Sequence, residues 1–324
     1  MKTKVLIVDR VYKRSQEIFS QANDIEFIVV SKEEEQIAAA VKDNNANAVV
    51  LATDKYTGPL YDSLGQKALI ARYGVGHDGI EKTKASQNNQ YVTITPGVLD
   101  NSVAEHTIFL LGALARNIAS SNSEIKNNSW KKTTGIELAG KTLSIIGCGA
   151  IGRRVAQIAS FGLSMKVIAF DIAKLDAEKL KRDYGIQKFT SSLQNAISEA
   201  DAVSIHLPAI EPTKDFVNPE MLSMMKKCAM LVNTSRGSIV DESALYDALS
   251  SGQIAGAAID VYKKEPYEPQ DSEKDLRKLD NIIMTPHLGS STKDSSDRMA
   301  ECVLKNIRLW REQDINNMDI VNTK

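Results

Sequence analysis

Short runs of apolar, β-prone residues alternate with longer amphipathic stretches over most of the chain. Strands of a parallel sheet read as such continuous runs, because crossover helices cover both faces of the sheet. The runs form an earlier and a later block, namely 5–8, 25–30, 48–51, 68–72 and 92–94, then 143–146, 167–170, 202–205, 230–232, 257–259 and 282–284. The alternation predicts an α/β fold whose later block is a doubly wound sheet.

Composition excludes several classes of partner and site. The 40 Lys and Arg residues nearly cancel the 41 Asp and Glu residues, so a net charge of -1 gives no overall attraction for nucleic acid or an anionic membrane. The longest apolar stretch, 108–115, is far shorter than the roughly 18 residues that span a bilayer. The 3 cysteines are widely spaced without a CxxC pair, which predicts neither a disulfide framework nor a metal site. Asp9 and Arg10 end the first apolar run before a signal peptide can form, so we expect a cytoplasmic protein.

Two helices are expected outside the regular alternation. Ser102 and Glu105 fit a capping box that opens a helix over 102–119, and this helix is expected to bridge the two blocks. The stretch from Ser290 onward is one more helix, because its apolar residues recur on one stripe.

A glycine-rich turn, GCGAIG, stands between the strand LSII and a helical run. In such a turn Gly147 permits the tight bend, Gly149 lets the backbone approach a pyrophosphate, and Gly152 lets the helix pack on the strand. The next strand ends in Asp171, whose carboxylate can accept hydrogen bonds from ribose hydroxyls and repel a 2′-phosphate. These features predict a dinucleotide site that prefers NAD, and Lys174 is the nearby basic residue that the alternative, NADP, would use.

Three residues at predicted strand ends suit a hydride-transfer reaction, which needs a proton carrier at the oxygen and a cation at the substrate. His287 ends a strand before a glycine turn, where open α/β sheets place ligands. Glu265 is expected to hold that imidazole and favour its protonated form, and Arg236 offers a fork for a carboxylate. Each residue also has a structural alternative: a helix cap for His287, a solvated turn for Glu265 and a surface ion pair for Arg236. Of the other histidines, we expect His106 to be packed in its helix and His206 to have a structural or cofactor-side role.

Taken together, these motifs resemble those of the D-isomer-specific 2-hydroxyacid dehydrogenases, which are NAD-dependent oxidoreductases. GCGAIG with Asp171, SIHLP, VNTSRGSIVDESAL, AGAAIDVY, KKEP and TPHLGSST occur in that family in the same order. The whole chain resembles phosphoglycerate dehydrogenases without an added regulatory domain. The resemblance implies that Arg236 orients the substrate, Glu265 is the carboxylate partner and His287 is the acid/base. In reduction of a 2-oxo acid, the imidazolium would give its proton to the carbonyl oxygen as hydride reaches the carbonyl carbon.

The resemblance also implies contacts for the substrate and the cofactor. Backbone amides of Val75 and Gly76, in the segment RYGVGHDGI, would hold the substrate carboxylate, and its glycines allow that close approach. His77 in the same segment is expected to be a loop residue. Besides the three glycines and Asp171, the predicted cofactor contacts are Ala150, Ile151, His206, Leu207, Pro208, Thr234, Ser235, Asp260 at the nicotinamide amide, Leu288 and Gly289.

The family architecture implies two doubly wound domains. Residues 1–100 and 290–324 would form a flavodoxin-like substrate domain, and residues 101–289 a Rossmann domain that binds NAD. Closure of the cleft between them would bring the first-domain loop onto the substrate and exclude water. The helix that begins near Ser102 contributes to a homodimer in this family, so we expect a homodimer.

One segment departs from the phosphoglycerate dehydrogenase pattern. Those enzymes carry an arginine after the third strand, where the substrate phosphate binds, whereas this chain reads VVLATDKYTGPL. Lys55 would substitute only as a point charge, beside the negative Asp54. The expected reaction interconverts a D-2-hydroxy acid and its 2-oxo acid, and 3-phosphoglycerate or a related anionic acid such as a phosphonate analogue is a candidate substrate. The alternative functions are a non-catalytic NAD-sensing protein, like some corepressors of this family, and a dehydrogenase of formate or phosphite.

Overall fold

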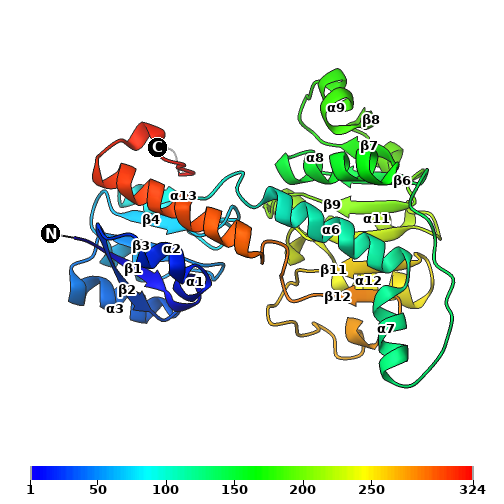
Figure 1. Ribbon diagram of the computed structural model, residues 1–324, viewed down its shortest axis with the longest axis horizontal. Helices are drawn as coiled ribbons and strands as arrows, with labels where there is room; N and C mark the ends of the chain where they lie inside the picture. The colour runs from blue at the N-terminus through cyan, green and yellow to red at the C-terminus, as the bar shows by residue number, and fades with distance from the viewer. Residues whose placement is uncertain (1, 323–324) are drawn as a thin grey trace. The chain divides into compact units, whose positions relative to one another are not determined.

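The computed structural model describes residues 2–322, and their contacts divide the chain into two compact units. One unit combines the residues up to Leu99 with those from Ser291 onward, and the other is Asp100–Ser290. Each unit is built around a parallel sheet with helices packed on it (Figure 1). The predicted α/β fold class is therefore confirmed. Within 2–322, no helix has the length and the apolar character that crossing a lipid bilayer requires.

The sheet of the first unit has the strand order β2-β1-β3-β4-β5, and each neighbouring pair is parallel. This order is typical of flavodoxin-like folds. Its strands are β1 (Thr3–Val8), β2 (Ile25–Val30), β3 (Ala48–Leu51), β4 (Leu69–Arg72) and β5 (Tyr91–Thr93). Its helices are α1 (Asp9–Arg14), α2 (Gln16–Ser20), α3 (Glu34–Asn44), α4 (Leu60–Ser63), α5 (Lys82–Gln87), α13 (Lys293–Arg311) and η5 (Ile315–Asn317). Strands β3 and β4 are buried along their whole length, and β3 is accordingly a continuous apolar run, whereas β4 ends in the buried Arg72.

The sheet of the second unit has the strand order β12-β11-β10-β9-β6-β7-β8, again with parallel pairs. Apart from the additional strand β12, this is the Rossmann order, and the strand order reverses between β6 and β9. Its strands are β6 (Thr142–Ile146), β7 (Lys166–Phe170), β8 (Ile186–Thr190), β9 (Ala202–Ile205), β10 (Met230–Asn233), β11 (Gly256–Ile259) and β12 (Ile282–Met284). Its helices are α6 (Asp100–Ala115), α7 (Ile118–Lys126), α8 (Ala150–Gln157), η1 (Ile158–Gly162), α9 (Ala177–Tyr184), α10 (Leu193–Ile197), η2 (Glu211–Thr213), α11 (Pro219–Ser223), η3 (Gly237–Ile239), α12 (Glu242–Ser250) and η4 (Leu276–Lys278).

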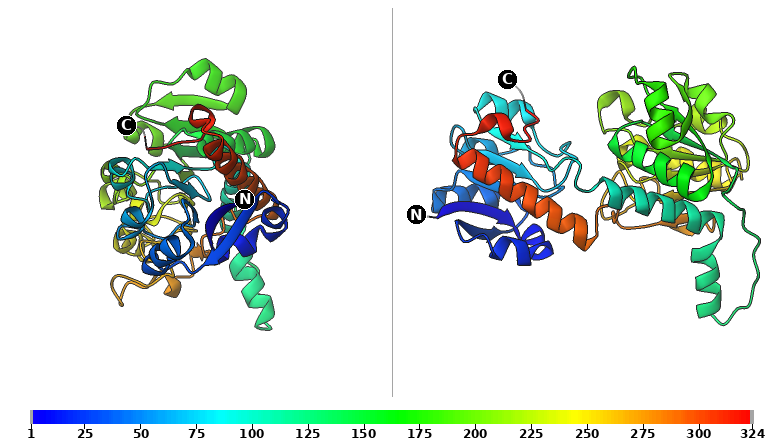
Figure 2. Two further views of the ribbon diagram at one scale, coloured as in Figure 1. Left: turned by 90° about the vertical axis from the view of Figure 1, so that its left-hand side faces the viewer. Right: turned by 45° about the horizontal axis from the view of Figure 1, so that its top comes forward.

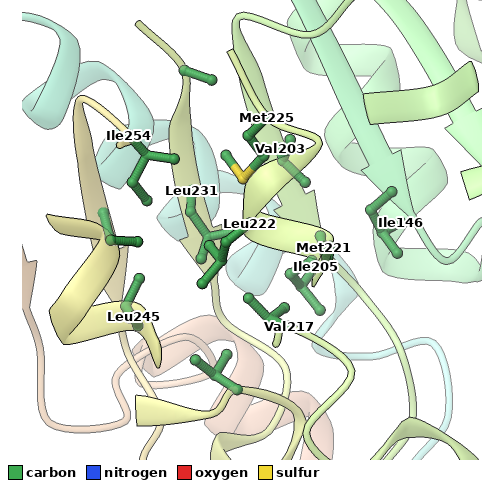
Figure 3. Packing of buried hydrophobic residues seen from close by; sticks show 14 of the residues in the cluster. Ile146, Val203, Ile205, Val217, Met221, Leu222, Met225, Leu231, Leu245 and Ile254 are labelled. Atoms are coloured by element: carbon green, nitrogen blue, oxygen red, sulfur yellow. The ribbon is translucent and has the colours of Figure 1, made fainter. Parts of the chain in front are cut away.

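Two apolar clusters cover the two faces of this second sheet. Successive residues of a strand point to opposite faces, so Ile145 packs with α6 and α8, whereas Ile146 packs with α11 and α12. Figure 3 shows the latter cluster, in which Met221 and Leu222 of α11 lie beside strands β9 and β10. All four side chains are buried. This packing holds the strand ends in place, and those ends carry most of the predicted site residues.

The expected helix over 102–119 is two helices in the structure. Helix α6 ends before Asn117, whose left-handed φ of 55° separates it from α7. The expected capping box is wrong, because α6 begins ahead of Ser102 and the Glu105 carboxylate accepts a hydrogen bond from the Asn101 side chain. Figure 2 shows α7 and the chain that follows it extending away from the rest of the second unit.

Candidate active site

The candidate site lies at the carboxyl edge of the sheet in the second unit. The strands are parallel, so the loops after β6, β9, β10, β11 and β12 all leave from this edge. These loops carry the GCGAIG turn, His206, Arg236, Asp260 and His287. The turn after β6 stands at the reversal of strand order, where open α/β sheets bind ligands.

Close backbone contacts require two glycines of this turn. Gly147 has a φ of 99°, and a Cβ atom there would lie 2.5 Å from the carbonyl oxygen of His206. A Cβ atom at Gly152 would lie 2.2 Å from the carbonyl oxygen of Gly147. Helix α8 therefore starts close to the end of β6, with Gly149 as its N-cap and no side chain capping its first N–H groups. These N–H groups, from Ala150 onward, suit a pyrophosphate.

Asp171 directly follows β7, and its carboxylate is held beside the glycine turn. Its Oδ2 accepts a hydrogen bond from the Cys148 N–H at 2.8 Å, and its Oδ1 accepts one from the Ala173 N–H at 2.9 Å. Two isoleucines after strands of the same edge are exposed, Ile172 by 88% and Ile210 by 53%. They belong to no motif, and their one signal in the sequence is an apolar residue within a polar loop. A fixed carboxylate for a ribose and exposed apolar surface for a base fit a dinucleotide such as NAD.

His287 and Glu265 form the pair that the sequence predicts. The Nδ1 atom of His287 lies 2.8 Å from Oε2 of Glu265, and Oε1 of Glu265 accepts a hydrogen bond from the Tyr262 N–H at 3.1 Å. The backbone of His287 has a φ of 55°, and its N–H donates to the carbonyl oxygen of Asp260 at 2.8 Å. Few non-glycine residues adopt this conformation, and the contacts with Asp260 and Glu265 hold the backbone and the ring of His287.

The lowered pKa of Glu265 also indicates that it is paired with His287. Burial alone would raise the pKa of Glu265, but the hydrogen bond and charge of His287, the Tyr262 N–H and the charge of Arg236 together lower it. The Arg236 guanidinium donates to the carbonyl oxygen of Ser235 at 2.7 Å. Because the charge of Arg236 acts on Glu265, the structure brings all three predicted residues to one edge of the sheet.

Asp260 organises the loop that carries His287. Its buried carboxylate accepts hydrogen bonds from the N–H groups of Leu288 and Gly289, each at 2.8 Å, and from the Thr285 hydroxyl at 2.5 Å. His106 of α6 also reaches it, with Nε2 3.2 Å from Oδ1. Burial raises the pKa of Asp260, but these donors outweigh it and lower the value. His106 and Thr285 thus belong to this network, which no sequence motif indicates because segments distant in the chain form it.

Among residues 2–322, no charged side chain is paired with His206. Its Nε2 lies 2.8 Å from the Ser204 hydroxyl, and burial lowers its pKa to about 3, so the ring is neutral in the folded protein. Thr234, another predicted cofactor contact, has its hydroxyl 2.8 Å from that of Thr107 in α6. The other predicted contacts at this edge are the half-buried Ile151, Leu207 and Ser235 and the exposed Pro208.

The predicted loop for the substrate carboxylate belongs to the first unit and follows β4. The buried Arg72 closes this loop, because its Nε donates to the carbonyl oxygen of Gly76 at 2.8 Å and its guanidinium also donates to that of Tyr73. Gly74 has a φ of 138°, and a Cβ atom there would lie 3.1 Å from the guanidinium. Arg72 thus fixes the backbone around Val75 and Gly76, whose contact with a substrate stays a prediction.

Lys55 is exposed in the segment after β3, and Arg10 contacts the two residues that precede it, Thr53 and Asp54. Arg10, which follows β1, forms an ion pair with Asp54 and donates to the Thr53 hydroxyl at 3.0 Å. The strands β1 and β3 are adjacent, so their carboxyl ends adjoin. The segment also contacts the loop after β4, because a Cβ atom at Gly79 would lie 2.5 Å from the carbonyl oxygen of Asp54.

Comparisons with known proteins find relatives that match nearly the whole chain. A family model described as D-isomer specific 2-hydroxyacid dehydrogenase, NAD binding domain, matches residues 108–289. The glyoxylate reductase of Thermococcus litoralis is 34% identical over 326 residues, which cover 97% of this chain and 96% of that protein. The D-3-phosphoglycerate dehydrogenase of Methanocaldococcus jannaschii is 34% identical over 310 residues, which cover 94% of this chain and 57% of that protein. The solved structure of D-lactate dehydrogenase from Aquifex aeolicus, complexed with NAD and lactic acid, has a TM-score of 0.84 at 27% identity and matches 99% of both chains.

Proposed function

The chain belongs to the D-isomer-specific 2-hydroxyacid dehydrogenase family of NAD(P)-dependent oxidoreductases, and we propose that it interconverts small 2-oxo acids and D-2-hydroxy acids with NAD(H). The observation that carries the proposal is the 2.8 Å contact between His287 Nδ1 and Glu265 Oε2, with Arg236 close enough to lower the pKa of Glu265. A protein that only senses NAD has no need of this set, so its presence favours catalysis over sensing.

The three residues have distinct parts in the proposed reaction. When bound, the nicotinamide supplies or accepts the hydride. Glu265 engages Nδ1 of the ring, so Nε2 is the nitrogen of His287 that exchanges a proton with the substrate oxygen. The ring is protonated at the start of reduction and neutral at the start of oxidation. Arg236 binds the substrate carboxylate and polarises the carbonyl group.

We assign NAD rather than NADP to the second unit. The carboxylate of Asp171 is held by two backbone N–H groups, and it would accept hydrogen bonds from the ribose hydroxyls of NAD and would repel a 2′-phosphate. Ile172 and Ile210 supply exposed apolar surface for the adenine. Lys174 is the residue that NADP would use, and it lies beyond this carboxylate in an exposed loop.

Glyoxylate and hydroxypyruvate are the substrates that we place first. The hydroxypyruvate reductase of Thermotoga maritima is 35% identical over 300 residues, and several other relatives are glyoxylate reductases. The ion pair with Asp54 neutralises Arg10, the arginine that reaches the segment after β3, and so disfavours a phosphate there. Lys55 remains as the cation for a phosphorylated acid such as 3-phosphoglycerate, which we place second.

We further propose that the two units have separate roles and that the protein forms a homodimer. The first unit contributes the substrate loop around Val75, and the second unit binds NAD. Helices α6 and α7, with the chain after α7, expose Phe109, Ile118, Ile125 and Trp130. Exposed apolar side chains on a projecting arm favour a homodimer formed by this part of the second unit. Light scattering of the purified protein tests this assembly, and a monomer would contradict it.

Turnover with a panel of 2-oxo acids tests the proposed function. NADH oxidation is followed with glyoxylate, pyruvate, hydroxypyruvate, phosphohydroxypyruvate and phosphonopyruvate, and then repeated with NADPH. We expect the highest kcat/KM with glyoxylate or hydroxypyruvate and NADH. A preference for the phosphorylated acid would instead indicate that Lys55 binds the substrate phosphate. No turnover with any acid would favour a protein that only senses NAD. His287→Ala should lower kcat by about a hundredfold or more, and a loss below about tenfold would contradict its acid/base role.

A further inference from the structure

Glu242 is a buried carboxyl group for which the proposed reaction has no use. It is the first residue of α12 and is 6% exposed. Its Oε1 accepts a hydrogen bond from the backbone N–H of Lys263 at 2.8 Å. Its Oε2 is buried without a hydrogen-bond partner among the residues that the structure describes. Burying a carboxyl group for one hydrogen bond is unfavourable, so a benefit elsewhere is expected.

The N–H that Glu242 accepts belongs to the segment that leads to Glu265. Tyr262 starts this segment, and its hydroxyl, a single donor, lies 3.0 Å from the carbonyl oxygens of both Ile259 and Thr285. The Tyr262 N–H donates to Glu265 itself at 3.1 Å. One residue of chain therefore separates the backbone group held by Glu242 from the side chain that Glu265 presents to the imidazole.

The segment is also packed directly against the loop that carries Arg236. A Cβ atom at Gly237 would lie 1.9 Å from the carbonyl carbon of Tyr262 and 2.4 Å from the backbone nitrogen of Lys263. The side chain of Lys263 is fixed from the other side, with Nζ 2.5 Å from a carboxylate oxygen of Asp215. The hydrogen bond to Glu242 is thus one of several constraints that converge on Tyr262 and Lys263.

We propose that Glu242 is a positioning residue, whose carboxyl oxygen holds the Lys263 N–H and thereby keeps Glu265 aimed at His287. This inference rests on the proposed function, since it takes the pair of Glu265 and His287 as the acid/base. Glu242 itself touches neither of these two side chains in the contacts above. Its effect passes through the backbone of the segment that ends in Glu265.

The surroundings of Glu242 decide which substitution leaves its role intact. Burial raises the pKa of Glu242, against the hydrogen bond and charge of Lys263, and the negative charges of Asp241 and Asp215 raise it further. The hydroxyl of Tyr267 is a further titratable group nearby, and burial and the charge of Glu242 both raise its pKa. Because this environment disfavours a negative charge, the neutral side chain of Glu242→Gln should be accepted and should still offer an oxygen to the Lys263 N–H.

Two variants and one double variant test the inference. Glu242→Leu keeps the buried volume but removes the acceptor, and we expect it to lower kcat about tenfold at an unchanged KM for NADH. Glu242→Gln should retain kcat within about threefold. In the background of Glu265→Gln, Glu242→Leu should cost less than about twofold more, because its effect passes through Glu265. Thermal unfolding and NADH binding are measured for each variant.

Each result bears on the inference. A loss of stability in Glu242→Leu without a loss of kcat would make Glu242 merely structural, and so would a full, additive loss in the double variant. If Glu242→Leu does not fold, a folded Glu242→Gln with kcat tenfold below the wild type still overturns the inference. If Glu265→Gln and His287→Ala keep full activity, the proposed function fails. If those two lose activity while Glu242→Leu does not, the role of Glu242 alone fails.

Discussion

Replacing Glu265 by glutamine should lower kcat about 30-fold while the KM for NADH changes little. The change keeps the size of the side chain but removes its negative charge. In the wild type, burial acts against that charge, but His287 and the other donors lower the pKa of Glu265 below its ordinary value of 4.5. Glu265 is therefore ionised from pH 5 to 8, and the deficit of the variant is expected throughout this range.

The magnitude follows from the geometry of the pair. The two atoms are 2.8 Å apart, and the side chains of His287 and Glu265 are 31% and 36% exposed. A hydrogen bond between charged groups contributes about 1.5–3 kcal/mol, and this partial exposure places the pair near the lower end, at about 2 kcal/mol. Since about 1.4 kcal/mol corresponds to tenfold in rate, the expected loss is about 30-fold.

Steady-state kinetics with matched variants check this value. Glu268→Gln is the control, because Glu268 lies three residues on, is exposed and pairs with Lys264. It should leave kcat unchanged. A Glu265→Gln enzyme that folds normally and keeps kcat within about twofold of the wild type would refute the assignment of Glu265 as the partner of the imidazole. An equal loss in both variants would refute the argument from geometry.

Three further predictions concern the cofactor site and the first unit. Gly152→Ala places a Cβ atom 2.2 Å from a backbone oxygen and should destabilise the fold by about 3 kcal/mol and weaken NADH binding. Gly112→Ala in α6, with open space around its Cβ, should instead raise the melting temperature slightly in the same thermal scan. Asp171→Ala should raise the KM for NADH about 30-fold and leave the KM for NADPH less affected, and equal changes would contradict the NAD assignment. Asp24→Asn should cost about 1 kcal/mol at pH 7, because the hydrogen bond and charge of Arg308 lower the pKa of Asp24 from 3.8 to about 2 and its exposure weakens the pair. A lowered pKa stabilises the fold above the ordinary value, so in denaturant titrations the deficit should be full at pH 7 and shrink between pH 4 and pH 2.

The strands and the candidate catalytic residues were predictable because their signals are local or topological. A strand covered on both faces is rich in apolar residues, so the run 202–205, which is apolar except for Ser204, is β9. The glycines of GCGAIG act over a few residues of chain. Arg236, Glu265 and His287 each follow a strand, and parallel strands bring their carboxyl ends to one edge whatever the details of packing.

Helix boundaries and side-chain partners were harder to predict, because several helix starts and several hydrogen-bond partners are compatible with the same local sequence. Ser102 does not cap a helix, because α6 begins at Asp100. The side chain of Asn101 donates a hydrogen bond to the carboxylate of Glu105 instead. The domain with which a terminal helix packs is likewise a matter of tertiary contacts, since α13 lies on β4 of the first unit.

By itself, the sequence determined the α/β class, the dinucleotide turn and the set of residues at the strand ends, because each follows from periodicity or from spacing within one strand and its loop. Only the tertiary structure decided that His106 reaches Asp260, that Glu242 holds the segment before Glu265, and that Arg10 is paired with a carboxylate. Each of these contacts joins segments that are distant in the chain. Their geometry depends on how helices and loops pack on the sheet, and no local pattern of residues specifies that packing.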